Sequence, residues 1–532
     1  MAIIKSLDKT GISSGPQKTV ALPIALTTLL AIIAGLAAAS GSLLIAGLIG
    51  AALCCVFLFF APIPLLWFVI VGATTVAGLT TLYLPQAGPV RWSFVLAALF
   101  LGLSAIARHF FDKIGSLKRN QVAGGTLLFW CLLYLAIVIF SSLYNDGLDF
   151  GVVVGLKNHF QVWGILVAFM LIPMTLRQAN AFIYYLLFLG TVQLIPVLHQ
   201  YFVLAPQRAG LTKVDVVVGT FVGSMHGGGA NALLAMVQVT CVALLAGFWR
   251  LGKLRIVSLV LASLLLLIPT LLNEAKIVLV ALPLALGVVF WDYLKRHVVV
   301  LMLSSVMIVP VLAGLLWIQA DIMREHNMGK NRDLQSFIES TIEYNVGEQG
   351  YGNYILNRTS VYTFWWSQHG SRDALGTLIG HGAASSKDAD ASLSENTLAQ
   401  TRYPGYGIGL TGVSALLWET GILGLIAVVG LLASALRLAN RLANHYGNSQ
   451  IGMNIRAAQA GVAVFAASLL HNQSFVFELG YQTVLMLLLG YIAVVGRLTF
   501  GEHGIRPANI GVAVSNANSC KQVISFTEPA RR

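Results

Sequence analysis

Residues 256–291 read IVSLVLASLLLLIPTLLNEAKIVLVALPLALGVVFW, and this stretch decides the fold class. It holds two long apolar runs that only the short hairpin NEAK, residues 273–276, separates. A membrane-spanning helix needs about 20 predominantly apolar residues, so the stretch predicts two spans joined by a tight turn. The rest of the chain agrees, because 57% of its 532 residues are hydrophobic and 10% are charged. Soluble domains carry about 25% charged residues, so lipid is expected to face much of this chain.

Apolar runs of similar length recur and predict an all-α polytopic membrane protein with about fourteen transmembrane helices. The runs are 20–39, two within 43–84, 90–107, 125–143, 160–176, 181–202, 230–248, 256–272, 277–291, 297–318, 411–435, 457–475 and 481–495. They divide the chain into an N-terminal tail (1–19), eleven spans (20–318), one large loop (319–410), three spans (411–497) and a C-terminal tail (498–532).

The net charge of +12 lies mostly in short basic clusters between apolar runs. Such clusters mark the cytoplasmic side of a membrane protein, whereas long loops are exempt from this bias. Both termini are therefore predicted to be cytoplasmic, and the 319–410 loop is predicted to lie outside. Because the membrane pattern accounts for the basic charge, no nucleic acid is expected as a partner. The five cysteines show no metal-ligand spacing and predict no disulfides.

Three regions on the predicted outer side keep polar side chains that hydropathy does not require. They are the loop at 203–229, the hairpin at 273–276 and the 319–410 loop, which is net acidic and rich in aromatic residues. Cations on the outer side are the opposite of the bias that places basic residues in the cytoplasm. Their presence there favours an anionic ligand. Arginine binds phosphate oxygens through two parallel charged hydrogen bonds, and lysine supplies a point charge. Together with aromatic faces for sugar rings, these residues fit a lipid diphosphate that carries a glycan.

A glycosyl transfer on the outer side needs such a lipid-linked donor, with the diphosphate as leaving group. Cations stabilise the negative charge that develops as the bond breaks, and a His, Asp or Glu takes the proton of the acceptor hydroxyl. No His/Asp/Glu cluster shows metal-ligand spacing, so no metal site is expected.

Each of these regions also has a plainer structural interpretation. Arg208 and Lys213 can contact lipid head groups, and Glu274 and Lys276 can form a salt pair with the lysine reaching water. The tryptophans of the large loop can form an interfacial belt or a loop core, and its histidines can be solvated. His471, at the end of a span, can serve a helix contact.

Several short motifs follow one another along the chain. They are Arg208 eleven residues before Gly219, the VGTF run at 218–221 with Asn231 after it, the 273–276 hairpin, Arg358 ahead of Trp365 and Trp366, the GHG run at 380–382, and the ETGILG run at 419–424. In this order they resemble the O-antigen ligase and O-antigen polymerase family of bacterial membrane glycosyltransferases, and the resemblance covers about residues 200–430.

The family resemblance implies a GT-C-like helical fold in the bacterial inner membrane, donors linked to undecaprenyl diphosphate, and neither a metal nor another cofactor. Family members often have arginine in the short hairpin, where this chain has Lys276. Ligases carry histidines late in the large loop, where this chain reads Ser394-Glu395-Asn396. The departure favours a polymerase over a ligase, and the general base stays open between His369, His381 and Glu395.

The expected function is polymerisation of lipid-linked oligosaccharide repeat units into an exopolysaccharide, capsule or O antigen, with membrane lipids and a chain-length regulator as further partners. Glu274 and His471 are additional site candidates. The glycan is expected to contact Tyr362, Trp365 and Trp366, and the cations expected to hold diphosphate are Arg208, Lys213, Lys276, Arg358, Arg372 and Arg402.

Three alternatives remain on sequence grounds. The first is ligase-type transfer of the glycan to a lipid or protein acceptor. The second is a flippase for lipid-linked oligosaccharides, which should carry charged residues inside its spans. The predicted spans are nearly free of charge and the outer loop is long, which favours the transferase. The third is a structural partner in a secretion complex.

Overall fold

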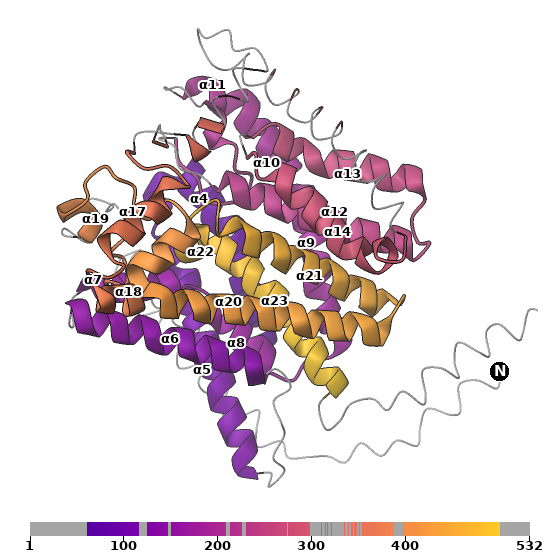
Figure 1. Ribbon diagram of the computed structural model, residues 1–532. Helices are drawn as coiled ribbons and strands as arrows, with labels where there is room; N and C mark the ends of the chain where they lie inside the picture. Colours follow the sequence, from indigo (N-terminus) through magenta and orange to yellow (C-terminus); the bar gives the residue numbers. More distant parts are fainter. Residues whose placement is uncertain are drawn as a thin grey trace, which may run out of the picture.

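The computed structural model describes residues 61–115, 125–146, 150–208, 213–225, 230–273, 275–297, 354–387 and 397–500, with isolated positions between 310 and 351. In this part of the chain every regular element is a helix, and there is no strand (Figure 1). The all-α fold class is therefore confirmed for the residues described.

The first half of the chain forms helices α3 to α11 with short π and 3-10 turns between them. Their bounds are α3 Pro62–Val71, η1 Gly72–Val76, α4 Ala77–Tyr83, η2 Pro85–Ala87, α5 Val90–Gly115, α6 Gly125–Asp146, α7 Phe150–His159, α8 Trp163–Leu171, α9 Leu176–Val192, α10 Leu194–His199, η3 Gln200–Leu204 and α11 Ala205–Gln207.

The second half contains the helices of the large loop and the last spans. Their bounds are η4 Lys213–Val216, α12 Asn231–Arg250, α13 Ile256–Leu271, α14 Val278–Leu294, α17 Ser360–Gln368, α18 Ala374–Ile379, α19 Leu398–Thr401, α20 Gly412–Tyr446, α21 Gln450–Ser468, α22 Ser474–Phe477 and α23 Leu479–Phe500.

Among the described residues, seven continuous helical stretches are long and apolar enough to cross a membrane, which confirms the membrane class. They are Pro62–Tyr83, Pro85–Phe111, Gly125–Asn145, Leu176–Gln207, Asn231–Arg250, Gly412–Tyr446 and Leu479–Phe500. Helices α13 and α14 coincide with the two apolar runs of 256–291 and are shorter. The number fourteen stays a prediction, because residues 1–60 and most of 298–353 lie outside the described residues.

The sixth predicted span differs from the structure. In place of one helix over 160–176, α7 and α8 form a pair that bends by 50° at residues 160–162. Side-chain hydrogen bonds stabilise the bend between α7 and α8. Gln161 Nε2 and Gln482 Nε2 both donate to the backbone oxygen of Asn158, at 3.3 and 2.6 Å. Gly155 lets α7 approach the loop after α18, since an added Cβ would lie 2.6 Å from Ala383 Cβ.

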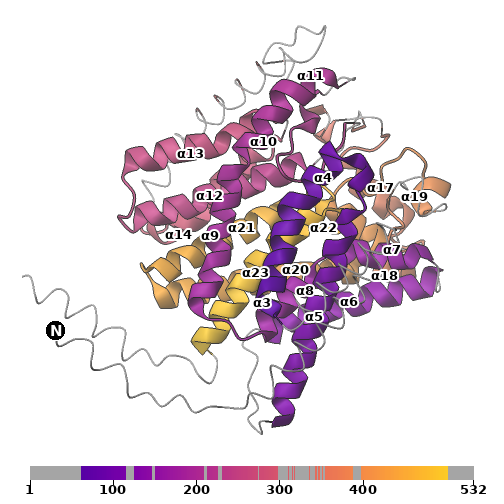
Figure 2. The same ribbon diagram turned by 180° about the vertical axis from the view of Figure 1, so that it is seen from behind.

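Helices α12 and α23 form the centre of the bundle. Inside the molecule, 83% of the apolar window of α12 and 78% of that of α23 are buried, against 33% for α6. Helix α20 packs along α6 and α21, and α8 packs between α5 and α23 (Figures 1 and 2). The less buried helices, α5 and α6, therefore form the periphery that faces lipid.

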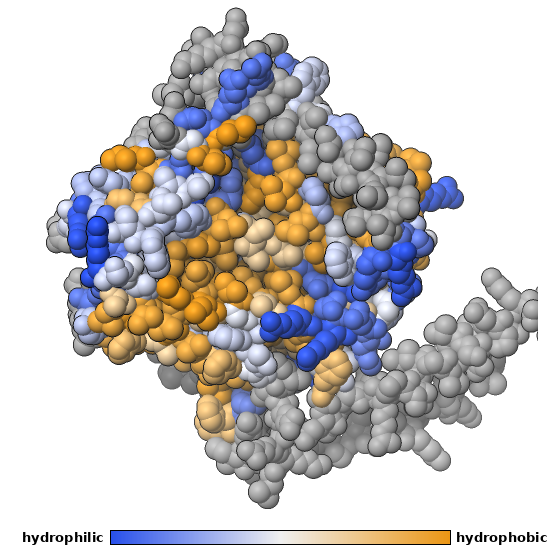
Figure 3. All heavy atoms as spheres, in the orientation of Figure 1, coloured by the Kyte–Doolittle hydropathy of each residue, from blue (hydrophilic) through white to orange (hydrophobic). Residues whose placement is uncertain are grey.

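The surface has the layered character of a membrane protein. Apolar residues cover the middle of the face drawn in Figure 3, and hydrophilic residues gather on opposite sides of this apolar band. Large exposed apolar side chains on the periphery include Leu99, Phe129 and Leu132. Soluble proteins rarely expose apolar patches beyond a few hundred Å², so this band is the surface that contacts lipid.

The described helices of the large loop lie together at one end of the bundle, at the left in Figure 1. Helices α17 and α18 pack against α20. A second, smaller hydrophobic core joins this layer to α20, and it includes Val361, Trp365, Tyr403, Ile408 and Trp418. The loop helices are therefore anchored to a long apolar helix.

Candidate functional site

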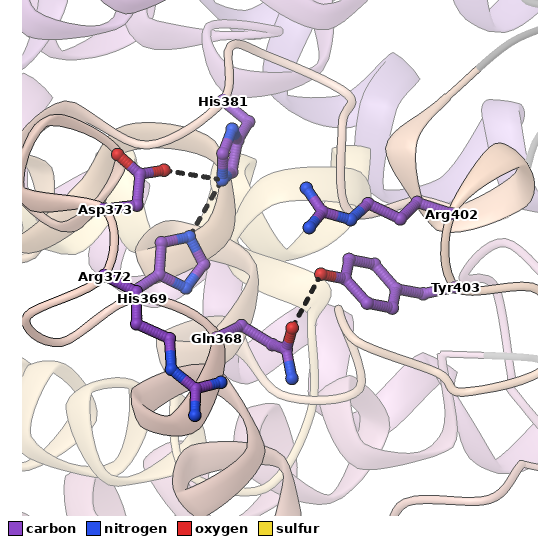
Figure 4. A pocket seen from close by; sticks show the side chains of 7 residues that line it. All are labelled: Gln368, His369, Arg372, Asp373, His381, Arg402 and Tyr403. Atoms are coloured by element: carbon purple, nitrogen blue, oxygen red, sulfur yellow. Dashed lines mark hydrogen bonds and ion pairs between the residues drawn. The ribbon is translucent and has the colours of Figure 1, made fainter.

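A pocket of about 230 Å³ opens in the loop layer. In Figure 4, His369, His381 and Arg402 converge on it, whereas the side chain of Arg372 points away. The pocket thus gathers two predicted bases and two predicted cations. Its lining side chains come from the end of α17, the turn after it, the residue that follows Gly380, and the end of α19: Gln368, His369, Arg372, Asp373, His381, Arg402 and Tyr403.

Two glycines bring α18 into direct backbone contact with α20. Gly380 has φ 73° and Gly421, at a kink inside α20, has φ 63°. A Cβ on Gly380 would lie 2.5 Å from the carbonyl carbon of Glu419, and a Cβ on Gly421 would lie 2.4 Å from that of Leu378. Only glycine fits such positive φ with backbone so close. The GHG run at 380–382 and the ETGILG run at 419–424 therefore pack against each other backbone to backbone, and this contact is called the joint.

Backbone hydrogen bonds across this joint fix the position of His381. The amide of His381 donates to the backbone oxygen of Trp418 at 2.8 Å, and the amide of Gly382 donates to that of Glu419 at 3.1 Å. Ser141 Oγ on α6 donates to the same Glu419 oxygen at 2.9 Å. The loop that carries His381 is thereby held by both α20 and α6.

A buried chain of polar side chains lies under the same loop. His159 Nε2 and Glu419 Oε2 are 2.6 Å apart, and both side chains are fully buried. Ser386 Oγ donates to Glu419 Oε1 at 2.6 Å, and the Tyr134 hydroxyl lies 2.6 Å from His159 Nδ1. Each member has a partner, as buried polar groups require. No role was predicted for Glu419 beyond its place in the ETGILG run, because its partner His159 lies 260 positions away in the sequence.

The two pocket histidines face each other through their Nε2 atoms, which are 2.8 Å apart. His369 Nδ1 lies 2.9 Å from the backbone oxygen of Trp365. Because a carbonyl only accepts, Nδ1 carries the hydrogen, and the neutral His369 ring keeps a lone pair on Nε2. Asp373 Oδ2 lies 4.0 Å from His381 Nε2. In that tautomer the Nε2–H of His381 donates to His369 Nε2, and the hydrogen-bonded pair lies beside a carboxylate.

Both imidazoles are held in the neutral form. Burial lowers the pKa of His369 below its usual 6.5 and outweighs the opposing Trp365 carbonyl and Asp373. Burial, and next the neighbouring His369, lower the pKa of His381 to about 4, against the opposing influence of Asp373. At neutral pH the pair therefore has nitrogen lone pairs that can accept a proton or bind a metal ion.

Aromatic rings surround the pair, and they differ in exposure. Trp365 stacks on His369 with ring centroids 4.9 Å apart, and Trp418 contacts the same ring edge-on at 4.7 Å. Trp365 is buried, whereas Trp366 is 62% exposed. The Tyr362 hydroxyl lies 2.9 Å from Thr411 Oγ1 at the start of α20. Trp365 thus belongs to the loop core, and Trp366 has the exposure that a glycan contact needs.

A second group of cations surrounds His471. Arg358 Nε donates to the backbone oxygen of His471 at 2.8 Å, and its guanidinium lies 4.2 Å from the ring centroid of Tyr351. Lys276, from the turn between α13 and α14, and Arg358, from the start of the loop layer, both act electrostatically on His471.

Arg208 is connected to that turn through a chain of polar contacts. It is buried, donates through Nε to the Met225 backbone oxygen at 3.1 Å, and lies 3.5 Å from Asp215. Asn231 Nδ2 donates to Asp215 at 3.4 Å, and Asn273 Nδ2 donates to the Asn231 backbone oxygen at 3.2 Å. Arg208 and the hairpin at 273–276 are thus parts of one polar region.

Two kinds of candidate remain. Lys213 begins the short turn η4, two residues before Asp215. Glu274 and Glu395 lie outside the described residues.

Asp373 is a pocket residue that the sequence analysis missed. His369, Asp373 and His381 each offer one ligand atom, and these atoms lie within 4.8 Å of one another. The His-x3-Asp spacing was the only signal in the sequence, and it is too common to predict a site. The fold supplies the third member, because the turn after α17 and the joint at Gly380 bring His381 back beside them.

No protein-family model matches this chain, and no curated protein matches it.

Proposed function

We propose that the protein is a membrane glycosyltransferase that polymerises lipid-linked oligosaccharide repeat units. The observation that carries the proposal is the pocket in which a neutral histidine pair, Asp373 and Arg402 converge at one end of an apolar helix bundle. A base for a hydroxyl and a cation for a phosphate lie side by side there, next to the layer that faces lipid.

In the proposed reaction the acceptor hydroxyl oxygen attacks the anomeric carbon of the donor sugar. The new glycosidic C–O bond forms as the bond from that carbon to the diphosphate oxygen breaks, and the electron pair leaves with the diphosphate. The hydroxyl proton passes to the His369–His381 pair, and Asp373 stabilises the resulting imidazolium. Arg402, whose guanidinium points toward the pair, stabilises the charge on the leaving group.

The separation of the two cation groups favours a polymerase over transfer to an unrelated acceptor. Arg358 and His369 flank opposite ends of α17, which at 1.5 Å per residue is a separation of roughly 15 Å along the helix. A polymerase binds two lipid diphosphates at once, one on the donor and one on the acceptor. Arg402 would hold the donor diphosphate, and Arg358 with Lys276 would hold that of the acceptor.

The test replaces His381 with glutamine in a strain that depends on this chain for its polymer. His381→Gln should leave membrane insertion intact and abolish long polymer, with single repeat units accumulating on lipid. His445, an exposed histidine at the far end of α20, provides the matched control, and His445→Gln should give normal polymer. Normal polymer from His381→Gln would remove the pocket from the reaction.

A further inference from the structure

We infer that His369, Asp373 and His381 form a binding site for a divalent transition-metal ion such as Zn²⁺. The inference concerns the same pocket and rests on the proposed function only for what the metal does there. An ion bound at His369 Nε2 and His381 Nε2 would occupy the lone pairs of the pair, so in the metal-bound protein these histidines would bind the leaving phosphate through the ion and would not act as the base. It departs from the metal-free chemistry that the family resemblance implies.

The ligand types and their positions match a metal site. Two imidazoles and one carboxylate form the three-residue set that leaves positions open for a substrate or water. Metal–ligand bonds of about 2.1 Å at right-angled to tetrahedral geometry place neighbouring ligand atoms about 3.0–3.4 Å apart. The two Nε2 atoms are 2.8 Å apart and the carboxylate oxygen is 4.0 Å from His381 Nε2. All three ligand atoms lie within 4.8 Å of one another, so shifts of less than about 2 Å would seat one ion between them.

The contacts of His369 fix its ring in the way that is typical of metal-binding histidines. Such residues almost always donate their other ring N–H to a carbonyl or carboxylate, which fixes the tautomer and the ring. His369 donates Nδ1–H to the Trp365 backbone oxygen at 2.9 Å and stacks on the Trp365 ring. Its Nε2 lone pair is therefore directed at His381 Nε2, and both Nε2 atoms can bind one ion when His381 carries its hydrogen on Nδ1.

The two carboxylate oxygens of Asp373 have different neighbours, one in the helix cap and one in the pocket. Oδ1 accepts a hydrogen bond from the Gly376 amide at 2.8 Å and caps the start of α18. Oδ2 is the atom nearest His381. The cap keeps the carboxylate in place without using the oxygen that a metal would take.

Arg402 indicates what occupies the open positions. Its guanidinium points into the same space and would repel a bare cation. An anionic oxygen donor bound to the metal removes that repulsion, because it contacts both charges. A phosphate oxygen has this chemistry, so the metal and Arg402 together would bind a phosphate group.

The experiment uses the full-length protein purified in detergent, stripped with a chelator and dialysed against Zn²⁺. One Zn²⁺ per chain should remain bound by elemental analysis. Asp373→Asn keeps the cap on α18 but loses the charge, and it should weaken Zn²⁺ binding at least about tenfold. His381→Gln should do the same, Asp373→Glu should restore part of the binding, and His445→Gln should bind as the wild type does.

Co²⁺ gives a second readout, because the visible spectrum of a bound Co²⁺ ion reports nitrogen and oxygen ligation in the wild type and should vanish in Asp373→Asn. Absence of stoichiometric Zn²⁺ in the wild type, or equal binding by all variants, overturns the metal site. If polymer synthesis still depends on His381 in that case, the proposed glycosyl transfer stands without a metal. If the metal binds and polymer synthesis does not depend on His381, the metal site stands and the proposed function falls.

Discussion

Replacing Gly421 with alanine should disrupt the joint that holds His381, and the expected cost follows from two observed features. Gly421 has φ 63° and ψ −165° inside α20, a region that is essentially restricted to glycine and costs about 1–3 kcal/mol for other residues. The new Cβ would also lie 2.4 Å from the backbone of Leu378. Overpacking of this kind adds about 1–3 kcal/mol.

Gly447 provides a matched control in the same helix. It follows the end of α20 with φ 53°, and nothing lies within 4 Å of its added Cβ. Gly447→Ala should therefore cost only the backbone contribution, about 1–3 kcal/mol, and Gly421→Ala should cost about 1–3 kcal/mol more.

Thermal unfolding of the purified variants, followed by tryptophan fluorescence, measures the difference in stability. Polymer from cells that carry each variant measures the effect on His381, and we expect Gly421→Ala to lose at least about tenfold in polymer while Gly447→Ala retains it. Equal midpoints and equal polymer for the two variants would refute the reasoning that the joint positions the pocket.

Four further predictions follow from the buried pair, the histidine pKa values, the second cation group and the exposed Trp366. Glu419→Gln removes a fully buried carboxylate that is hydrogen-bonded to His159 and Ser386, so we expect a loss of about 1–3 kcal/mol in unfolding free energy, measured by thermal unfolding and contradicted by a wild-type midpoint. Since burial lowers the pKa of His381 to about 4, the base stays neutral as the pH falls from 7 to 5. The rate of polymer formation by the purified protein should therefore be constant over that range and fall as the pH approaches 4. A loss of rate centred near pH 6.5 would contradict the lowered pKa. Arg358→Ala should abolish long polymer while the protein still inserts into the membrane, and a normal distribution of polymer lengths would remove the second cation group from the site. Trp366→Ala should retain polymer at a reduced rate. Gel electrophoresis of the glycans measures both.

The membrane class and the main apolar helices could be predicted from the sequence because they depend on local composition. The two apolar runs of 256–291 become α13 and α14. The bend between α7 and α8 could not be predicted in this way. It depends on Gln482 reaching the Asn158 backbone from another helix, a contact that hydropathy does not encode.

The candidate site was predictable in its residue types and not in its arrangement. His369 and His381 stood out as polar residues in a long loop, but their pairing depends on the turn after α17 and on the close approach of Gly380 to α20. Asp373 gave no signal of its own, since a single acid in a net acidic loop is unremarkable in a sequence. The six cations were predicted to hold diphosphate, and the sequence did not show that they divide, with Arg402 in the histidine pocket and Arg358 beside His471.

The most direct measurement of the central proposal is a reaction with the purified protein and the lipid-linked glycan that accumulates in a strain lacking this chain. Incubation of the two should release one free lipid diphosphate for each glycosidic bond formed and lengthen the remaining glycans by whole repeat units. His381→Gln should release none. A purified, folded wild-type protein that leaves this glycan unchanged and releases no lipid diphosphate would contradict the proposed reaction.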